Sequence, residues 1–226
     1  MGSYPSLNGK VVLITGGSRG IGAQTARAFA AQGARVCVVG RDQAALAAVV
    51  EEITALGGTA MSAVADVTDA AALAAARGVV EAELGPVEVL GAFAGGQGYP
   101  ATTAELTEQR WRQVLDSDLT SAFLTVQTFL PGMVEHGRGV MLTRHLATEL
   151  GPRGIRVNCL APSSIRTEKV AANMPEAVQA QVAAKHPLAR LGTPQDVACA
   201  ALFLASDDAA WLTGLTIDVA GGRVTN

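Results

Sequence analysis

VVLITGGSRGIG, residues 11–22, is the stretch of sequence that decides the fold. Its apolar beginning, Val11 to Ile14, predicts a buried strand, and the apolar spacing from Ile21 to Ala31 predicts a helix. The glycine-rich turn between them lies where open parallel sheets bind ligands, beyond the carboxyl end of a strand. Glycines leave no Cβ between the backbone and an anion, and the free N–H groups of a helix start attract it. The stretch therefore predicts a phosphate-binding turn, with an ordinary tight connection as the alternative.

Outside this stretch, short apolar runs alternate with longer segments of helical period. The alternation predicts an α/β fold, in which a Rossmann-like, doubly wound parallel sheet carries helices on both faces. We expect one domain over residues 1–226, because the sequence has no linker, repeat or low-complexity tract. Thr193-Pro194-Gln195-Asp196 predicts a capped helix start. Further strands are expected at 35–39, 61–65, 87–93, 140–141, 155–160 and 215–219, and further helices at 43–56, 70–84, 107–115, 118–134 and 194–205.

The composition excludes several classes of protein. Hydrophobic residues make up 49% of the chain and charged residues 16%, which excludes disorder. The formal net charge is -3 and the charges are scattered, so we expect no nucleic-acid partner. The longest apolar run, 197–205, is too short to cross a membrane, and no signal peptide is recognisable. Three separate cysteines in apolar runs favour a reducing compartment, hence a cytoplasmic location, and no metal site: Cys37, Cys159 and Cys199.

The spacing of the turn, Thr-Gly-x-x-x-Gly-x-Gly over 15–22, and several further motifs resemble the short-chain dehydrogenase/reductase family. The resemblance extends over nearly the whole chain and is to members like the 3-oxoacyl-ACP reductases. It implies an enzyme that interconverts a small carbonyl compound and an alcohol by hydride transfer with a nicotinamide dinucleotide. The other matching motifs are Asp66-Val67, WRQVLDSDLTSAF (111–123), LPGM (130–133), ELGPRGIRV (149–157), Ala161-Pro162, 190–194 and 218–222.

The resemblance also implies which residues hold the cofactor. In the family, the glycine-rich turn binds the dinucleotide phosphates, the residue matching Asp66 contacts the adenine, and the stretch matching 162–167 embraces the nicotinamide. The cofactor-binding residues implied for this chain are Gly16, Ser18, Arg19, Gly20, Ile21, Gly22, Arg41, Asp66, Val67, Ala94, Gly95, Pro162, Ile165 and Thr167.

The residues after the second strand bear on which nicotinamide cofactor binds. An acidic side chain at the end of that strand would accept hydrogen bonds from the adenosine ribose and repel a 2′-phosphate, but Gly40 stands there. Arg41 follows it, and Arg19 in the turn could reach the same phosphate with its guanidinium fork. Asp42 argues the other way, because it could bind the ribose, although it could also cap the next helix. We therefore prefer NADP(H), with NAD(H) as the alternative.

The residues that carry catalysis in the family do not all occur in this sequence. In enzymes of the family, a Tyr hydroxyl donates a proton to the substrate, and a Lys follows this Tyr four residues later. A Ser orients the substrate oxygen. Reduction by hydride transfer needs such an acid, because it creates an alkoxide. Here the only tyrosines are Tyr4 and Tyr99, and neither precedes a lysine at that spacing. We expect most of the fifth strand and the following helix to be missing after Met141. Asp118 matches the family's helix Asn and is the one catalytic position carried over.

Four side chains are candidates to replace the missing acid, and each has a simpler interpretation. Tyr99, on the loop after the fourth strand, is typical of packing, Thr143 of a helix cap and His145 of an exposed helix face. His186 lies in the segment that covers the substrate in relatives, so it could belong to a lid.

Two functions stay open for this chain. One is an NADP(H)-dependent oxidoreductase, and the other is a catalytically inactive NADP(H)-binding relative that acts as a sensor or partner subunit. We expect a homo-oligomer, a dimer or tetramer, because the apolar stripe of helix 118–134 needs a cover and relatives assemble through the matching helix. The other expected partner is a small carbonyl or alcohol substrate, with no nucleic acid and no membrane.

Overall fold

The computed structural model describes residues 2–96, 101–137, 139–141 and 146–223. The strands of its main sheet are β1 (Val11–Thr15), β2 (Arg35–Gly40), β3 (Thr59–Val64), β4 (Val89–Ala92), β5 (Gly139–Met141) and β6 (Ile155–Val157). They are all parallel and lie in the order β3-β2-β1-β4-β5-β6. The strand order therefore reverses between β1 and β4, as in doubly wound folds, and the predicted α/β architecture is confirmed.

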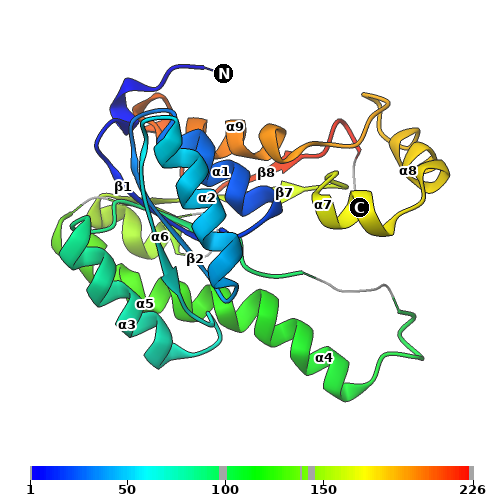
Figure 1. The fold of residues 1–226 in the computed structure, drawn as a ribbon, viewed down its shortest axis with the longest axis horizontal. Coiled ribbons are helices and arrows are strands. Elements are labelled where there is room, and N and C mark those ends of the chain that lie inside the picture. Colours follow the sequence, from blue (N-terminus) through cyan, green and yellow to red (C-terminus); the bar gives the residue numbers. More distant parts are fainter. Residues whose placement is uncertain (1, 97–100, 138, 142–145, 224–226) are drawn as a thin grey trace.

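Six helices cover the two faces of this sheet: α1 (Gly20–Ala30), α2 (Gln43–Ala55), α3 (Ala70–Glu83), α5 (Ser121–Glu135), α6 (Ala147–Leu150) and α9 (Pro194–Ala205). Successive residues of β1 point to opposite faces. Val12 and Ile14 pack into one apolar cluster with α1, α2 and α9, whereas Val11 and Leu13 pack into another with α3, α5 and α6. Figure 1 shows the two layers, with α1, α2 and α9 on one side of the strands and α3 and α5 on the other.

The predicted helix 118–134 is part of a longer helical run. α4 (Glu108–Leu115) passes through a π-helical turn, Asp116–Thr120, directly into α5. Such π-helical turns are rare overall, and those that occur are often found at functional sites. This one carries Asp118, so the side chain is aimed differently from what a regular α-helix would give.

The predicted sixth strand, 155–160, is divided in two. It forms β6 up to Val157 and then β7 (Cys159–Pro162), which pairs with β8 (Thr216–Val219) in a separate two-stranded sheet. The division falls at Asn158, which is fully buried. Its side chain donates to the Leu212 carbonyl oxygen at 2.9 Å and accepts from the Leu215 N–H at 3.2 Å. These bonds replace the ladder of the main sheet at this position, which is why the expectation of one continuous strand is wrong.

The region between β5 and β6 is short. β5 has three residues, α6 has four, and a 3-10 helix, Gly151–Arg153, leads into β6. Residues 142–145 lie outside the described residues. The other 3-10 helices are Pro5–Leu7 and Asp207–Ala209.

Two short helices, α7 (Glu168–Asn173) and α8 (Glu176–Ala183), precede α9.

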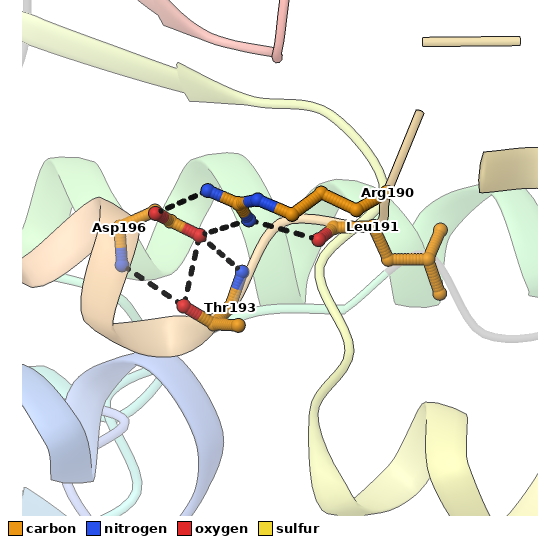
Figure 2. A network of polar contacts seen from close by, with 4 residues as sticks. All are labelled: Arg190, Leu191, Thr193 and Asp196. Carbon is orange, nitrogen blue, oxygen red and sulfur yellow. Dashed lines mark hydrogen bonds and ion pairs between the residues drawn. The ribbon is translucent and has the colours of Figure 1, made fainter. Parts of the chain in front are cut away.

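A network of hydrogen bonds and an ion pair stabilises the start of α9 (Figure 2). Asp196 accepts from the N–H and hydroxyl of Thr193 at 2.7 and 2.8 Å, and the Thr193 hydroxyl oxygen accepts from the Asp196 N–H at 3.3 Å. The predicted capped helix start is therefore confirmed. Arg190 donates to both Asp196 carboxylate oxygens at 2.7 and 2.9 Å and to the Leu191 carbonyl. This guanidinium, followed by the Thr193 bonds, lowers the pKa of Asp196 well below its ordinary value.

Within the described ranges, no helix combines the length and the apolar content needed to span a membrane, and no group of three or more metal-ligating side chains is arranged around a common point. Cys37, Cys159 and Cys199 are unbridged. Burial raises the pKa of the Cys37 thiol to about 12, so this thiol stays protonated and unreactive.

Candidate functional site

A cleft of about 710 Å³ opens beyond the carboxyl ends of β1, β2, β3 and β4. This is the crevice where doubly wound sheets bind ligands, and its volume falls in the range of small-molecule sites. The residues that line it are Gly16, Ser18, Arg19, Gly20, Ile21, Gly22, Gly40, Arg41, Ala65, Asp66, Val67, Thr68, Phe93, Ala94, Gly95, Gly96, Ser117, Thr167, Glu168 and Lys169.

Twelve of the fourteen residues predicted to bind the cofactor line this one cleft, although they come from four separate strand ends and from the start of α7. The two exceptions follow from the course of the chain after β7. Pro162 ends that strand and is exposed, while Ile165 is buried and forms an isolated bridge with Gly192. They support the stretch that leads to Thr167 and do not face the cleft.

The glycines of the turn are there because side chains would not fit. A Cβ on Gly22 would come within 2.3 Å of the Gly16 carbonyl oxygen, and one on Gly16 within 2.7 Å of the Phe93 carbonyl oxygen. Gly16 and Gly20 have φ values of +67° and +58°, a region that favours glycine. The turn therefore presents bare backbone to the cleft at the start of α1, and this cradle fits the phosphates of a dinucleotide.

The first turn of α1 has one polar contact that the sequence did not predict. Arg19 stands at the N-cap position without capping the helix by its side chain. The N–H of Gly20 donates instead to the Glu168 carboxylate at 3.1 Å. Next to it, the Thr167 methyl group lies against Gly20, and the Thr167 hydroxyl oxygen caps α7 by accepting from the Val170 N–H at 3.3 Å. The start of α7 therefore rests directly on the glycine-rich turn.

Two ion pairs lie at the adenosine end expected for the cleft. Arg19 contacts Asp42, and the Arg41 guanidinium lies 3.6 Å from the Asp66 carboxylate. Asp42 also caps α2 by accepting from the Ala45 N–H at 3.0 Å, as one of the two interpretations of this residue predicted. That backbone bond, followed by the bond from Arg19, lowers the pKa of Asp42.

Asp66 is anchored in a similar way. It accepts from the Thr68 N–H at 3.0 Å and from the Thr68 hydroxyl at 2.7 Å. These two bonds, with a smaller contribution from Arg41, lower the pKa of Asp66. Both carboxylates are therefore ionised at neutral pH, and each predicted phosphate-binding arginine has a carboxylate beside it.

Asp118 holds the loop after β4 rather than lining the cleft. Its carboxylate accepts from the Gly96 N–H at 2.9 Å and from the Ser117 hydroxyl. A Cβ on Gly95, whose φ is +146°, would come within 3.1 Å of the same carboxylate oxygen. The predicted catalytic position is thus placed to position Gly95 and Gly96, which do line the cleft.

The candidates for a replacement acid are not brought to the described part of the cleft. Tyr99, Thr143 and His145 lie outside the described residues. His186 is buried in a different cavity of about 260 Å³. Its Nδ1 lies 2.9 Å from the Val182 carbonyl oxygen and its Nε2 lies 3.1 Å from the Ser163 hydroxyl oxygen, so both ring nitrogens are engaged.

Eight cleft residues were not among those predicted to bind the cofactor. Most of them stand directly before or after a predicted site residue, so counting outward from the motifs in both directions would have found them. Glu168 and Lys169 follow Thr167 in sequence, but their approach to the turn is visible only in the tertiary contact with Gly20. The eight are Gly40, Ala65, Thr68, Phe93, Gly96, Ser117, Glu168 and Lys169.

Two family models match the chain. The short chain dehydrogenase model matches residues 10–141, and the enoyl-(acyl carrier protein) reductase model matches residues 139–223. The two matches meet at β5. The first family model therefore ends, and the second begins, directly before the short segment between β5 and β6.

Similar proteins cover almost the whole chain. An uncharacterised oxidoreductase of Methylorubrum extorquens is 36% identical over 247 aligned positions, which cover 96% of this chain and 98% of that protein. This alignment is longer than the 226 residues of the chain, so the relative has residues without a counterpart here.

Solved structures agree with the fold. The 3-oxoacyl-[acyl-carrier protein] reductase from Brucella melitensis superposes with a TM-score of 0.90 at 35% identity, covering 99% of this chain and 94% of that one. A 7 alpha-hydroxysteroid dehydrogenase in complex with NADH and 7-oxo glycochenodeoxycholic acid superposes with a TM-score of 0.91 at 33% identity, covering 99% and 97%.

Proposed function

The chain belongs to the short chain dehydrogenase family, and from that premise we propose that its cleft binds NADP(H) and that the protein interconverts a carbonyl and an alcohol by hydride transfer. One observation carries the proposal. The bare backbone of the glycine-rich turn, the start of α1 and the guanidinium groups of Arg19 and Arg41 all face one cleft. Such a cleft offers N–H groups to a diphosphate at one end and cations to a further phosphate at the other.

The preference for NADP(H) rests on charge at the end of β2. Gly40 leaves that position without the carboxylate that would repel a 2′-phosphate. Arg41 and Arg19 are exposed beside it, and water screens their ion pairs with Asp66 and Asp42. A phosphate with up to two negative charges can therefore displace these carboxylates. The NADH in the related steroid dehydrogenase supports dinucleotide binding and keeps NAD(H) as the alternative.

When bound, the nicotinamide supplies or accepts the hydride. The chain must then exchange a proton with the substrate oxygen, because hydride addition to a carbonyl creates an alkoxide. Among the described residues that line the cleft, the hydroxyls of Ser18, Thr68, Ser117 and Thr167 and the amino group of Lys169 carry exchangeable protons. The Tyr-x-x-x-Lys pair of the family does not occur in the sequence.

The second candidate function is an NADP(H)-binding relative without turnover, which acts as a sensor or partner subunit. A specific observation favours it: the sequence lacks the family's Tyr and Lys at their spacing, while the cradle for the dinucleotide is intact. The greater length of the aligned relative supports a loss of residues in this chain.

Stopped-flow measurement of bound NADPH distinguishes the two functions. Calorimetry first establishes the dissociation constants for NADPH and NADH, and we expect NADPH to bind roughly tenfold more tightly. The complex is then mixed with a panel of ketones and aldehydes. Loss of NADPH absorbance supports the oxidoreductase, whereas tight binding without oxidation supports the sensor. Absence of heat for both nucleotides would contradict both.

We also infer that the protein is a homo-oligomer in a reducing compartment such as the cytoplasm. The helical run of α4, the π-turn and α5 exposes Trp111, Leu119 and Phe123, and large apolar side chains gathered on one element favour a protein partner. The unbridged cysteines support the compartment.

A further inference from the structure

A carboxylate of the chain itself lies on the phosphate-binding turn. The Glu168 carboxylate accepts from the Gly20 N–H at 3.1 Å. Gly20 is the first residue of α1, so its N–H has no partner within the helix and carries part of the positive end of the helix dipole. Glu168 therefore uses the same kind of interaction that a phosphate of the cofactor would use at this turn.

The contact joins two segments that are far apart in the sequence. Gly20 follows β1, whereas Glu168 is the first residue of α7. Thr167 strengthens the junction, because it caps α7 while its methyl group lies against Gly20. The position of α7 relative to the turn is therefore fixed in part by the Glu168 bond.

Glu168 shares the wall of the cleft with the cationic side chains of Arg19 and Lys169. In the part of the chain that the structure describes, Glu168 forms no ion pair, and its carboxylate is exposed on the wall of the cleft. It therefore repels an approaching diphosphate while it occupies one of the N–H groups that would bind it. Both effects act in the same direction, against anion binding.

We propose that Glu168 is an internal competitor of the cofactor phosphates. Its carboxylate must leave the Gly20 N–H when a dinucleotide binds to the turn, so Glu168 lowers the affinity for the cofactor. The inference rests on the proposed dinucleotide site, and it adds a regulatory contact between that site and α7.

The substitution Glu168→Gln tests this inference, because glutamine keeps the size of the side chain and removes its charge. Calorimetric titration with NADPH and with NADH should show roughly two- to tenfold tighter binding than in the wild type. Both nucleotides should gain equally, since both contain the diphosphate. The difference between variant and wild type should shrink at high salt, because screening weakens the repulsion.

Glu176→Gln is the matched control. Glu176 also lies in the first turn of a short helix, α8, and is exposed, but it does not line the cleft. We expect its nucleotide affinities to equal those of the wild type.

Three outcomes would overturn the inference. Unchanged or weaker binding by Glu168→Gln, with binding by the wild type intact, contradicts the competitor alone and leaves the proposed function standing. If Glu176→Gln binds the nucleotides more tightly to the same extent, the gain in affinity comes from the overall charge of the protein and not from the Glu168 contact. If neither the wild type nor Glu168→Gln binds NADPH or NADH, the proposed function and this inference are both wrong.

Discussion

At the end of the cleft where we propose that the adenosine binds, four side chains set the local charge. Arg19 and Arg41 each lie beside a carboxylate, Asp42 and Asp66 respectively. Hydrogen bonds from backbone N–H groups lower the pKa of both carboxylates, so they stay ionised at neutral pH and balance the two guanidinium charges. The proposed selection of a 2′-phosphate therefore rests on the fork geometry of the arginines and less on a net positive potential.

Arg41→Ala should weaken the binding of NADPH much more than that of NADH. The substitution removes a guanidinium that can bond to the 2′-phosphate, which NADH lacks, so we expect roughly a tenfold loss for NADPH and less than about a twofold change for NADH. Calorimetry with both nucleotides measures the difference. Arg112→Ala, on an exposed ion pair of α4, is the control and should change neither affinity.

The converse substitution, Gly40→Asp, should reverse the preference toward NADH. A Cβ at this position meets its nearest neighbours, on Leu46 and Ser18, at 3.6 to 3.9 Å, so a side chain fits. A carboxylate there would accept hydrogen bonds from the ribose and repel the 2′-phosphate. Equal losses for both nucleotides in either variant would count against the assignment of this end of the cleft.

At the scale of elements, the start of α9 shows how a short sequence signal becomes an anchor. Thr193 and Asp196 cap the helix reciprocally, and Arg190, between α8 and α9, forms a bidentate ion pair with Asp196 (Figure 2). The helix packs against α1, whose first turn lies at the cleft. The cap therefore helps to hold α9 against α1, the helix that follows the glycine-rich turn.

Asp196→Asn should lower the free energy of unfolding by about 1 kcal/mol at pH 7, because the substitution removes the charge that caps α9 and pairs with Arg190. The loss is no larger because water screens the ion pair. The pKa of Asp196 in the folded protein is lowered, so its contribution is complete above the ordinary value of about 3.9 and is lost as the pH falls toward the folded value. Urea denaturation should therefore show a difference between wild type and variant that shrinks as the pH falls below about 4.

Asp208→Asn is the control for this series. Asp208 is exposed within η4, the 3-10 helix Asp207–Ala209, and takes no part in the cap of α9. We expect a stability close to that of the wild type at every pH. A difference between wild type and Asp196→Asn that stays constant down to pH 2 would contradict the ion-pair explanation.

At the scale of the whole molecule, the exposed apolar side chains of the run from α4 to α5 predict self-association. Leu119 and Phe123 are four residues apart in this run and are 64% and 59% exposed. Phe123→Asp should place a charge in the contact, so sedimentation velocity should show a homo-oligomer for the wild type and mainly monomer for the variant. Burying a charge without a partner opposes association strongly.

Leu56→Asp is the matched control, because Leu56 is also exposed but lies at the end of α2, away from this run. It should sediment like the wild type. A wild type that sediments as a clean monomer would contradict the predicted assembly.

Much of the fold and of the site is determined by the sequence itself. The strand and helix periods, the glycine-rich turn and the cap at Thr193 are readable because each depends on residues within a few positions of one another. The carboxyl ends of parallel strands share one edge of the sheet, so the residues placed after the first four predicted strands are placed in the cleft without further knowledge. Pro162 and Ile165, which follow the divided sixth strand, do not line it.

Only the tertiary structure decided which distant groups meet. Asn158 divides the predicted sixth strand because Leu212 and Leu215, more than fifty residues later, offer it backbone partners. Glu168 reaches Gly20 across 148 positions, a contact that depends on how α7 packs on the turn. Local sequence patterns specify backbone geometry and the buried face of each element, whereas such contacts depend on the order of the strands and the packing of loops, for which no short-range signal exists.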